Sequence, residues 1–371
     1  MSERAKQAQL EELKSKGIPV YSISRLDSIN NCLYEAYQTY IKGDRGESNI
    51  YAFAGSKIHD VLEKIMNNEA EPADLYPAMM GELDDMEMLG IEFPKDSNGN
   101  ETLKNNWIKN MTHFCESYEK PIGDFSTEEF FLYKTKKGHY LQGYIDLQEN
   151  FDDGSISIYD YKTSSMYSGE EIKKHGRQLL VYAMAKMQEG YRVNSIAWNM
   201  LKYARIEFMG YKTAKSKEKS LISKVVERRK IASELDKYIL QDMAEYMPEL
   251  DPIEFDFELA KFRQSNKLED LPEAVRGNYK VLPAIIQYEL TPENIQECED
   301  YINNTIERWE EMSGDEADYG PRKFTKMQKN GREVSNLFFC ISLCNHKNCH
   351  YMQEFLEKWN QEQDEERDIF A

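Results

Sequence analysis

The chain has 371 residues, of which 40% are hydrophobic and 12% aromatic. This is enough for a substantial core in one large domain or two modest ones, and it excludes a broadly disordered chain. No window of eighteen apolar residues occurs, so we expect no membrane span. The formal net charge of −19 excludes a surface that is basic throughout, which weighs against nucleic-acid binding unless the basic residues are segregated.

The N-terminal part of the chain has helical patterns. Its first stretch is polar and lacks the apolar segment of a secretory signal, so we expect a cytoplasmic protein. The first helix is expected over residues 3–16. A second begins near Ser22, with Ser24 as its N-cap and an apolar stripe behind it. A third is expected over residues 53–66.

The next segment interrupts this pattern. We interpret residues 67–100 as an acidic segment that is broken by Pro72, Pro77 and Pro94 and ends in a loop. A helix over residues 102–118 follows it.

The middle of the chain changes to the alternating pattern of strands. Short turns at Lys136–Gly138 and Asp152–Gly154 separate three runs rich in β-branched and aromatic residues. The predicted order is β-β-β-α-β, with strands over 127–133, 140–148 and 156–161, a helix over 170–188 and a strand over 195–203.

The part of the chain after these elements is highly charged. We expect a helical insertion over 212–290, with a helix near 216–246 and little strand signal. Residues 212–230 carry eight basic residues and two acidic ones, which makes them a candidate lining for a DNA groove. Thr291 and Pro292 are typical of a helix start, and a last helix is expected over 351–361.

Two carboxylates and a lysine are predicted to meet at one end of the sheet. Asp160 and Lys162 lie on the same face of their strand because strand side chains alternate. The hairpin turn before that strand brings Asp146 near them. Close carboxylates are costly without a cation between them, and Mg²⁺ prefers such oxygen ligands. Glu128 or Glu129 on the preceding strand is a further candidate carboxylate, although each of these patterns also fits a solvated strand end.

Four short motifs occur in a fixed order: G-x-x-x-H at Gly55–His59, G-x-x-D at Gly143–Asp146, D-x-K at Asp160–Lys162 and Q-x-x-x-Y at Gln178–Tyr182. In order and spacing they resemble the RecB-like branch of the PD-(D/E)xK nucleases, which includes the nuclease domains of RecB and AddB, CRISPR adaptation exonucleases and phage exonucleases. The resemblance covers residues 20–205 best. It implies an α/β fold with a restriction-endonuclease-like core, in which helices flank a small mixed sheet.

The resemblance also implies a role for each matching residue. Lys162 is expected to be the catalytic lysine, acting with Asp146 and Asp160. Mg²⁺ or Mn²⁺ is expected to be held by His59, Asp146, Asp160 and the backbone carbonyl of Tyr161. Gln178 and Tyr182 are expected to hold the DNA strand, although one face of an amphipathic helix would have the same spacing.

Three of the six cysteines crowd into ten residues near the C-terminus. Many members of the branch hold a [4Fe–4S] cluster through one early and three late cysteines. The resemblance therefore implies an iron–sulfur staple at Cys32, Cys340, Cys344 and Cys349, although the late spacing here is C-x3-C-x4-C instead of C-x2-C-x5-C. Zinc, with His346 and His350 nearby, and free buried thiols stay as alternatives.

These interpretations divide the chain into four parts: N-terminal helices with the first cluster cysteine over 1–52, the nuclease core over 53–211, a charged helical insertion over 212–290, and a C-terminal helix, cysteine cluster and acidic tail over 291–371. The resemblance implies a metal-dependent exonuclease acting on single-stranded DNA in recombination, repair or replication, in a bacterium or in the host cytoplasm of a phage. A structure-specific endonuclease and a non-catalytic DNA- or protein-binding scaffold are the alternatives. The chain has no P-loop motif, so any unwinding would come from a helicase or another partner protein.

Overall fold

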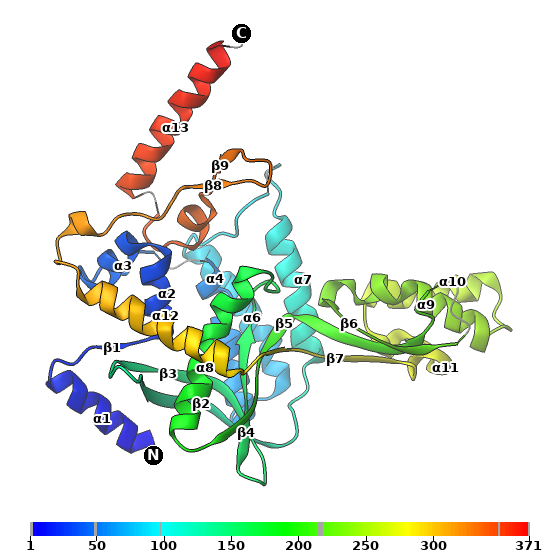
Figure 1. The fold of residues 1–371 in the computed structure, drawn as a ribbon. Coiled ribbons are helices and arrows are strands. Elements are labelled where there is room, and N and C mark those ends of the chain that lie inside the picture. Colours follow the sequence, from blue (N-terminus) through cyan, green and yellow to red (C-terminus); the bar gives the residue numbers. More distant parts are fainter. Residues whose placement is uncertain (1–2, 48–49, 97, 214–217, 348, 370–371) are drawn as a thin grey trace.

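A mixed sheet between two layers of helices forms the body of the molecule (Figure 1). The computed structural model describes residues 3–47, 50–96, 98–213, 218–347 and 349–369. The sheet has seven strands in the order β1-β3-β4-β5-β6, with β2 paired to β3 and β7 paired to β5. The α/β fold that the sequence predicted, a mixed sheet flanked by helices, is confirmed.

The predicted β-β-β-α-β unit is present at the centre of this sheet. Strands β2, β3 and β4 form an antiparallel meander, and helix α8 crosses from β4 to the parallel strand β5. A parallel pair needs such a crossover. The bounds are Asp124–Lys134 for β2, Tyr140–Asn150 for β3, Ser155–Lys162 for β4, Glu170–Gln188 for α8 and Arg192–Gly210 for β5.

Each face of the sheet packs against its own set of helices. Buried residues of α2 (Ile23–Asn31), α8 and α12 (Pro292–Glu310) form one apolar core with the sheet, called here the α8 core. Buried residues of α5 (Ser56–Met66), α6 (Leu75–Met88) and α7 (Thr102–Ser117) form a second, the α7 core. The site described below lies where these two cores meet at the sheet.

Helix α6 lies within a segment that was interpreted as broken. Pro77 is the third residue of α6, in the first turn, where a helix makes no use of the backbone N–H that proline lacks. The proline therefore marks the beginning of a helix here. Pro72 lies in a short 3₁₀ turn, Pro72–Asp74, just before it.

The segment that was expected to be helical over 216–246 begins with a strand. Strand β6 (Ser220–Glu227) precedes helix α9 (Ile231–Tyr246), and β7 (Tyr279–Tyr288) returns to the body. Both strands pair with the long strand β5. With α10 (Pro252–Ser265) and α11 (Glu273–Arg276) they form an arm that projects from the body and has its own apolar core (Figure 1).

The two ends of the chain carry shorter elements. The N-terminal ones are α1 (Glu3–Ser15), β1 (Val20–Tyr21), α3 (Leu33–Tyr40) and α4 (Ile50–Phe53). Helix α2 is capped by Ser22, whose hydroxyl accepts a hydrogen bond from the N–H of Arg25, so the prediction of Ser24 as N-cap was wrong. The C-terminal ones are the hairpin β8 (Thr325–Met327) and β9 (Glu333–Ser335), the π-helical turn η5 (Phe339–Leu343) and α13 (His350–Ile369).

Within the described residues, none of the helices is both long enough and apolar enough to cross a membrane.

Candidate active site

Two carboxylates that the sequence singled out lie opposite each other where strands β3 and β4 stop pairing. The last paired residues of these strands are Leu147 and Tyr159, so Asp146 and Asp160 occupy the next position. Instead of continuing the ladder, Asp146 Oδ2 accepts a hydrogen bond of 2.9 Å from the backbone N–H of Tyr161. The end of the ladder is therefore the place where the two carboxylates approach each other.

Glu128 extends this row of carboxylates onto strand β2. Its two chain neighbours pair with Ile145 and Leu147, which puts Glu128 opposite Asp146. Glu128 has a φ of 47°, a left-handed conformation that is uncommon for a residue with a side chain and occurs preferentially at functional sites. Residues two positions apart in a strand normally lie on the same face of the sheet. Ile145 belongs to the α8 core and Leu147 to the α7 core, so the regular alternation of strand β3 is interrupted at Asp146.

Asp160 is the most buried group of the site, with 1% of its surface exposed. Its Oδ2 lies 2.6 Å from Lys162 Nζ, which confirms that the two side chains share a face. Neither Asp160 oxygen accepts a hydrogen bond of good geometry from the described part of the chain. A buried carboxylate with open lone pairs is costly in free energy, so the ion pair with Lys162 satisfies it only in part.

His59 approaches the carboxylates from helix α5. Its Nδ1 lies 3.7 Å from Asp146 Oδ2, and its ring packs edge-on against Tyr161. The helix begins close to the segment after β4, because a Cβ on Gly55 would lie 2.7 Å from the Thr163 side chain, and Gly55 itself has a φ of 120°. Only glycine fits both conditions, which explains the first residue of the G-x-x-x-H motif physically.

A residue that the sequence did not indicate holds the start of this helix. Glu82 on α6 is fully buried. Its carboxylate accepts hydrogen bonds from the N–H of Gly55 at 2.8 Å, the hydroxyl of Ser56 at 2.9 Å and the N–H of Lys57 at 3.0 Å. An anion at a helix N-terminus stabilises the helix. Glu82 fixes the position of His59, and no local motif marks it.

The two residues expected to hold DNA, Gln178 and Tyr182, form a hydrogen-bond chain that begins at Lys162. Lys162 Nζ donates a hydrogen bond of 3.1 Å to Gln178 Oε1, and Gln178 Nε2 donates one of 2.6 Å to the hydroxyl of Tyr182. Tyr182 is 4% exposed and packs edge-on against Phe131. Neither Gln178 nor Tyr182 lines the pocket beside Lys162, so the geometry suits a pair that orients Lys162, and their contact with DNA stays a prediction.

Burial dominates the electrostatics of the site. It raises the pKa of Asp160 to about 6, although the Lys162 charge opposes this, and it also raises the pKa of Asp146. Burial and the charge of Asp146 raise the pKa of Glu128 to about 7. Burial lowers the pKa of Lys162, but the charges of Asp160 and Asp146 outweigh it and the net pKa is raised. Burial lowers the pKa of His59, which keeps its imidazole neutral.

This donor set suits a divalent cation. Carboxylate oxygens are the ligands that Mg²⁺ and Mn²⁺ prefer, and a neutral imidazole is the ligating form of histidine. The open lone pairs of Asp160 point to a missing positive charge. Within the described ranges, no three His, Cys, Asp or Glu side chains lie in an arrangement that could hold a metal ion; Lys162 lies against Asp160, and His59 faces Asp146.

The four cysteines expected to hold a cluster lie in two segments that pack together: the N–H of Glu47 donates to the carbonyl of Asn345, and Tyr34 packs against His350. Cys32 lies between α2 and α3, and Cys340 lies in η5. Burial raises the pKa of Cys340 to about 11 and that of Cys344 to about 12, and the Cys32 thiol raises both further. Cys349 acts on Cys340 and Cys32 in the same way. The cysteines are thus electrostatic neighbours, whereas Cys115 and Cys298 are buried elsewhere in the α7 and α8 cores.

The two nearby histidines have other partners. His346 Nε2 lies 3.3 Å from the Thr39 hydroxyl, and its Nδ1 lies 3.7 Å from Asp44 Oδ2. The ring of His350 packs edge-on against Tyr34. These contacts direct both imidazoles to groups other than thiols, which favours an all-cysteine ligand set over a mixed zinc site.

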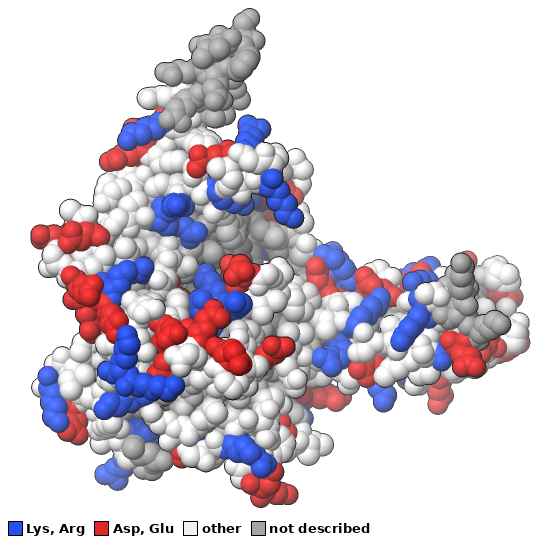
Figure 2. Space-filling model, in the orientation of Figure 1, with Lys and Arg blue, Asp and Glu red and all other residues white. Residues whose placement is uncertain are grey.

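The basic run over 212–230 does not form an open groove in its described part. The cations of Lys219, Lys224, Arg229 and Lys230 each form ion pairs with neighbouring carboxylates. Arg228 is buried and donates to the carbonyl of Leu201. Lys215 and Lys217 lie outside the described residues. Figure 2 likewise shows Lys and Arg mixed with Asp and Glu over the visible face.

A comparison with protein-family models places the chain in a known family. The model described as the PD-(D/E)XK nuclease superfamily matches residues 20–349. The matched range contains the carboxylate site, the arm and all six cysteines. A search of curated proteins found no significant match.

Proposed function

Because the chain belongs to the PD-(D/E)XK nuclease superfamily and is a metal-dependent nuclease, we propose that it hydrolyses DNA as a single-strand exonuclease of the RecB-like branch. Asp146, Asp160 and Lys162 are its catalytic residues, and its metal is Mg²⁺ or Mn²⁺. It acts in recombination, repair or replication, with duplex unwinding supplied by a partner such as a helicase.

The observation that carries the proposal is the buried carboxylate of Asp160. Neither of its oxygens accepts a hydrogen bond of good geometry from the described chain, although Oδ2 lies 2.6 Å from the Lys162 ammonium, and the residue lies opposite Asp146. A carboxylate is kept in this costly state where a cation or a reaction needs it. A binding scaffold has no such need.

The chain's own residues define what the site does. Asp146, Asp160, His59 and the carbonyl of Tyr161 would hold the cation, which, when bound, polarises the scissile phosphate and activates water. Lys162 is protonated, so it orients the attacking water and offsets the charge that develops on the phosphate, instead of acting as a base. Gln178 and Tyr182 fix the direction of the Lys162 ammonium.

The proposal includes a [4Fe–4S] cluster held by Cys32, Cys340, Cys344 and Cys349. Its support is the packing of the segment after Cys32 against the segment that holds Cys340, Cys344 and Cys349, together with the other partners of the His346 and His350 rings. Cysteine thiolates are the usual ligands of such clusters. The cluster would hold the N-terminal helices against the C-terminal segment.

The test is cleavage of end-labelled single-stranded, double-stranded and covalently closed circular single-stranded DNA, with Mg²⁺ or Mn²⁺. We expect the wild type to degrade linear single strands and to leave circles intact. Asp160→Ala and Lys162→Ala are expected to lower the rate by roughly 10³-fold. The control variants are Asp152→Ala and Lys136→Ala, which remove exposed charges of the same sign in the neighbouring turns. They should cleave DNA at the wild-type rate.

The other outcomes assign different functions. Cleaved circles would identify an endonuclease. No cleavage in either metal by a folded wild-type protein would contradict catalysis and favour a binding scaffold. Equal loss of activity in the turn variants would show that the effect is not specific to the site.

A further inference from the structure

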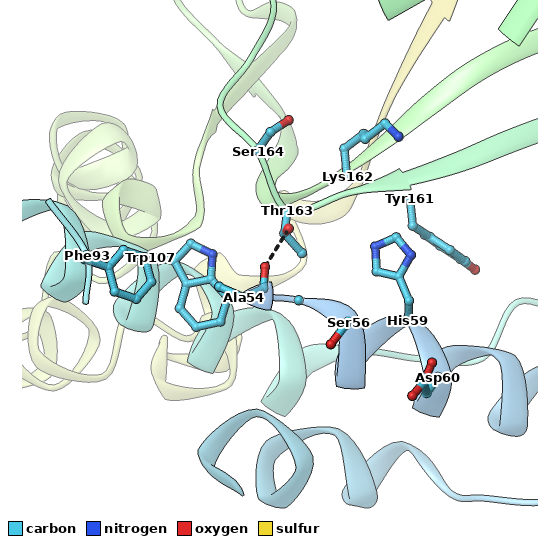
Figure 3. A pocket seen from close by; sticks show the side chains of 11 residues that line it. Ala54, Ser56, His59, Asp60, Phe93, Trp107, Tyr161, Lys162, Thr163 and Ser164 are labelled. Carbon is cyan, nitrogen blue, oxygen red and sulfur yellow. Dashed lines mark hydrogen bonds between the residues drawn. The ribbon is translucent and has the colours of Figure 1, made fainter. Parts of the chain in front are cut away.

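A pocket of about 400 Å³ opens beside the proposed catalytic centre. His59 and Lys162 line one end of it, and Trp107 and Phe93 line the other (Figure 3). The hydroxyls of Thr163 and Ser164 lie on the wall between them. The volume is at the low end of the range for small-ligand pockets, which suits one nucleotide and not a base pair.

The far end of this pocket is aromatic. Trp107 comes from α7, and Phe93 comes from the segment that precedes it. Their rings are 5.7 Å apart at an angle of 45°. Trp107 is 6% and Phe93 8% exposed, so the α7 core holds both rings in place and each presents only a small part of its surface to the pocket. Sites for single strands pair cationic groups with aromatic side chains on which bases stack, because every base has a π-face. The catalytic mechanism makes no use of either ring.

A second pocket lies next to the first, and Phe93 lines both of them. This neighbour has a volume of about 370 Å³ and shares Phe93 as a lining residue. Two exposed cations, Lys95 and Lys347, line it, with one carboxylate, Glu92. Lys347 lies 3.9 Å from the exposed Glu47, a weak surface pair, so the Lys347 ammonium remains available to a phosphate.

We propose that the two pockets form a track for a single DNA strand. The nucleotide next to the scissile phosphate places its base against Trp107, and the backbone beyond it passes Phe93 and meets Lys95 and Lys347. This track rests on the proposed nuclease function and adds the route of the strand. It is distinct from the basic run over 212–230, in which the cations from Lys219 to Lys230 are paired or buried.

The stacking half of the track is tested by a double-mutant cycle between protein and DNA. Binding of a fluorescent ten-nucleotide single strand is measured in Ca²⁺, which occupies carboxylate sites without supporting cleavage. One abasic nucleotide is moved along the strand. We expect a single sensitive position at which the abasic strand binds wild type about tenfold more weakly. Trp107→Leu should weaken binding of the intact strand to a similar extent, and its affinity should no longer depend on the position of the abasic nucleotide. Trp107→Phe should keep most of this dependence.

The phosphate half is tested by the salt dependence of binding. Each contact of a cation with a single-strand phosphate contributes about 0.7 to the slope of log K against log salt. Lys95→Ala and Lys347→Ala together should therefore lower the slope by about 1.4. Lys104→Ala, an exposed lysine on α7 that lines neither pocket, should leave it unchanged.

The outcomes separate the track from the function. Two results would overturn the track and leave the nuclease function intact, provided that the wild type cleaves DNA. One is a salt-dependence slope in the Lys95 and Lys347 variants equal to that of the wild type. The other is an effect of the abasic nucleotide in the Trp107 variants as large as in the wild type. Absence of both binding and cleavage in the wild type would overturn the function itself. Because Trp107 is buried, thermal melting is used to check that its variants fold. If Trp107→Leu does not fold, the variants of the exposed residues Lys95 and Lys347 decide the outcome.

Discussion

Three carboxylates lie in one row across strands β2, β3 and β4. Glu128 faces Asp146 in the strand register, and burial and that neighbouring charge raise its pKa. Negative charge gathered at this density favours cation binding. We therefore expect Glu128 to contribute to the proposed metal site in addition to Asp146 and Asp160.

We predict that Glu128→Gln, which keeps the shape and removes the charge, weakens Mn²⁺ binding about tenfold, or roughly 1.4 kcal/mol. Isothermal titration calorimetry measures this without DNA. Asp152→Asn, in the exposed turn after β3, is the matched control and should bind Mn²⁺ like the wild type. Equal affinities of the Glu128 variant and the wild type would restrict the site to the other two carboxylates.

The Tyr182 hydroxyl orients Gln178, and Gln178 in turn orients Lys162. We predict that Tyr182→Phe lowers kcat about tenfold and leaves KM for DNA unchanged, because groups that orient a catalytic residue act on the chemical step. Tyr159→Phe removes a hydroxyl that bonds to Glu149 on the same strand pair and should change neither constant. A raised KM with normal kcat would instead support the DNA contact that the sequence suggested.

The contrast between Asp160 and Glu128 shows what single residues reveal in a sequence. Asp160 and Lys162 were predictable because strand alternation alone puts them on one face. Glu128 was only one of two candidates, because its role depends on a left-handed backbone and on its register with Asp146. Both arise from pairing with β3, a tertiary effect that leaves no local signal.

Among the elements, helix α5 depends on a capping group from another helix. Glu82 accepts three hydrogen bonds from the first residues of α5. We predict that Glu82→Ala lowers the free energy of unfolding by about 2–3 kcal/mol, since hydrogen bonds to a buried charge are lost and their donors stay unpaired. Chemical denaturation measures the loss.

Asp85 provides the control for this prediction. It lies one turn later on α6 and pairs with Lys57 near the surface. Asp85→Ala should cost at most about 1 kcal/mol, because exposed ion pairs contribute little. A cost for Glu82→Ala no larger than this would mean that solvent replaces the cap and that α5 does not need it.

A buried histidine joins the body to the arm. His113 on α7 donates through Nε2 to the carbonyl of Asn266 at 3.1 Å, and its Nδ1 accepts from Arg228 at 3.4 Å. Both contacts suit a neutral ring. Burial, with the Arg228 charge, lowers the pKa of His113 to about 4. The unfolded chain, with an ordinary histidine pKa near 6.5, therefore binds a proton more readily than the folded one.

The folded protein should thus lose stability as the pH falls below 6.5. From these two pKa values we predict that proton uptake at His113 lowers the free energy of unfolding by about 2 kcal/mol when the pH falls from 7.5 to 5. His113→Gln cannot titrate, so its pH dependence should be flatter than that of the wild type by this amount. Parallel curves for the two proteins from urea denaturation would contradict the prediction.

Elements with strong local periodicity were predictable, and those defined by distant partners were not. Helix α8 was expected over 170–188 and covers Glu170–Gln188, because its apolar stripe and its flanking strands agree. Strand β6 was missed because its burial comes from the arm, where it pairs with the extended end of β5. Helix α6 was missed because its proline lies in the first turn.

At the scale of the whole molecule, the segment after Cys32 packs against the segment that holds the late cysteines, next to the proposed DNA track. Ile341 and Ser342 line the second pocket, and they lie between Cys340 and Cys344. A group that binds all four cysteines would therefore hold these two segments together and also fix the position of one wall of the track. Ligation of this kind adds directly to folding stability, because it is absent from the unfolded chain.

We predict that protein purified without air contains iron and absorbs visible light, and that Cys32→Ser loses both and melts at a lower temperature. Cys115→Ser and Cys298→Ser, which remove buried thiols outside the group, should retain the iron. The Cys32 variant should also bind single-stranded DNA more weakly with its metal-site affinity unchanged, since the track wall moves while the carboxylates do not. Zinc in place of iron would overturn the cluster but keep the staple; wild-type protein with neither metal would overturn both.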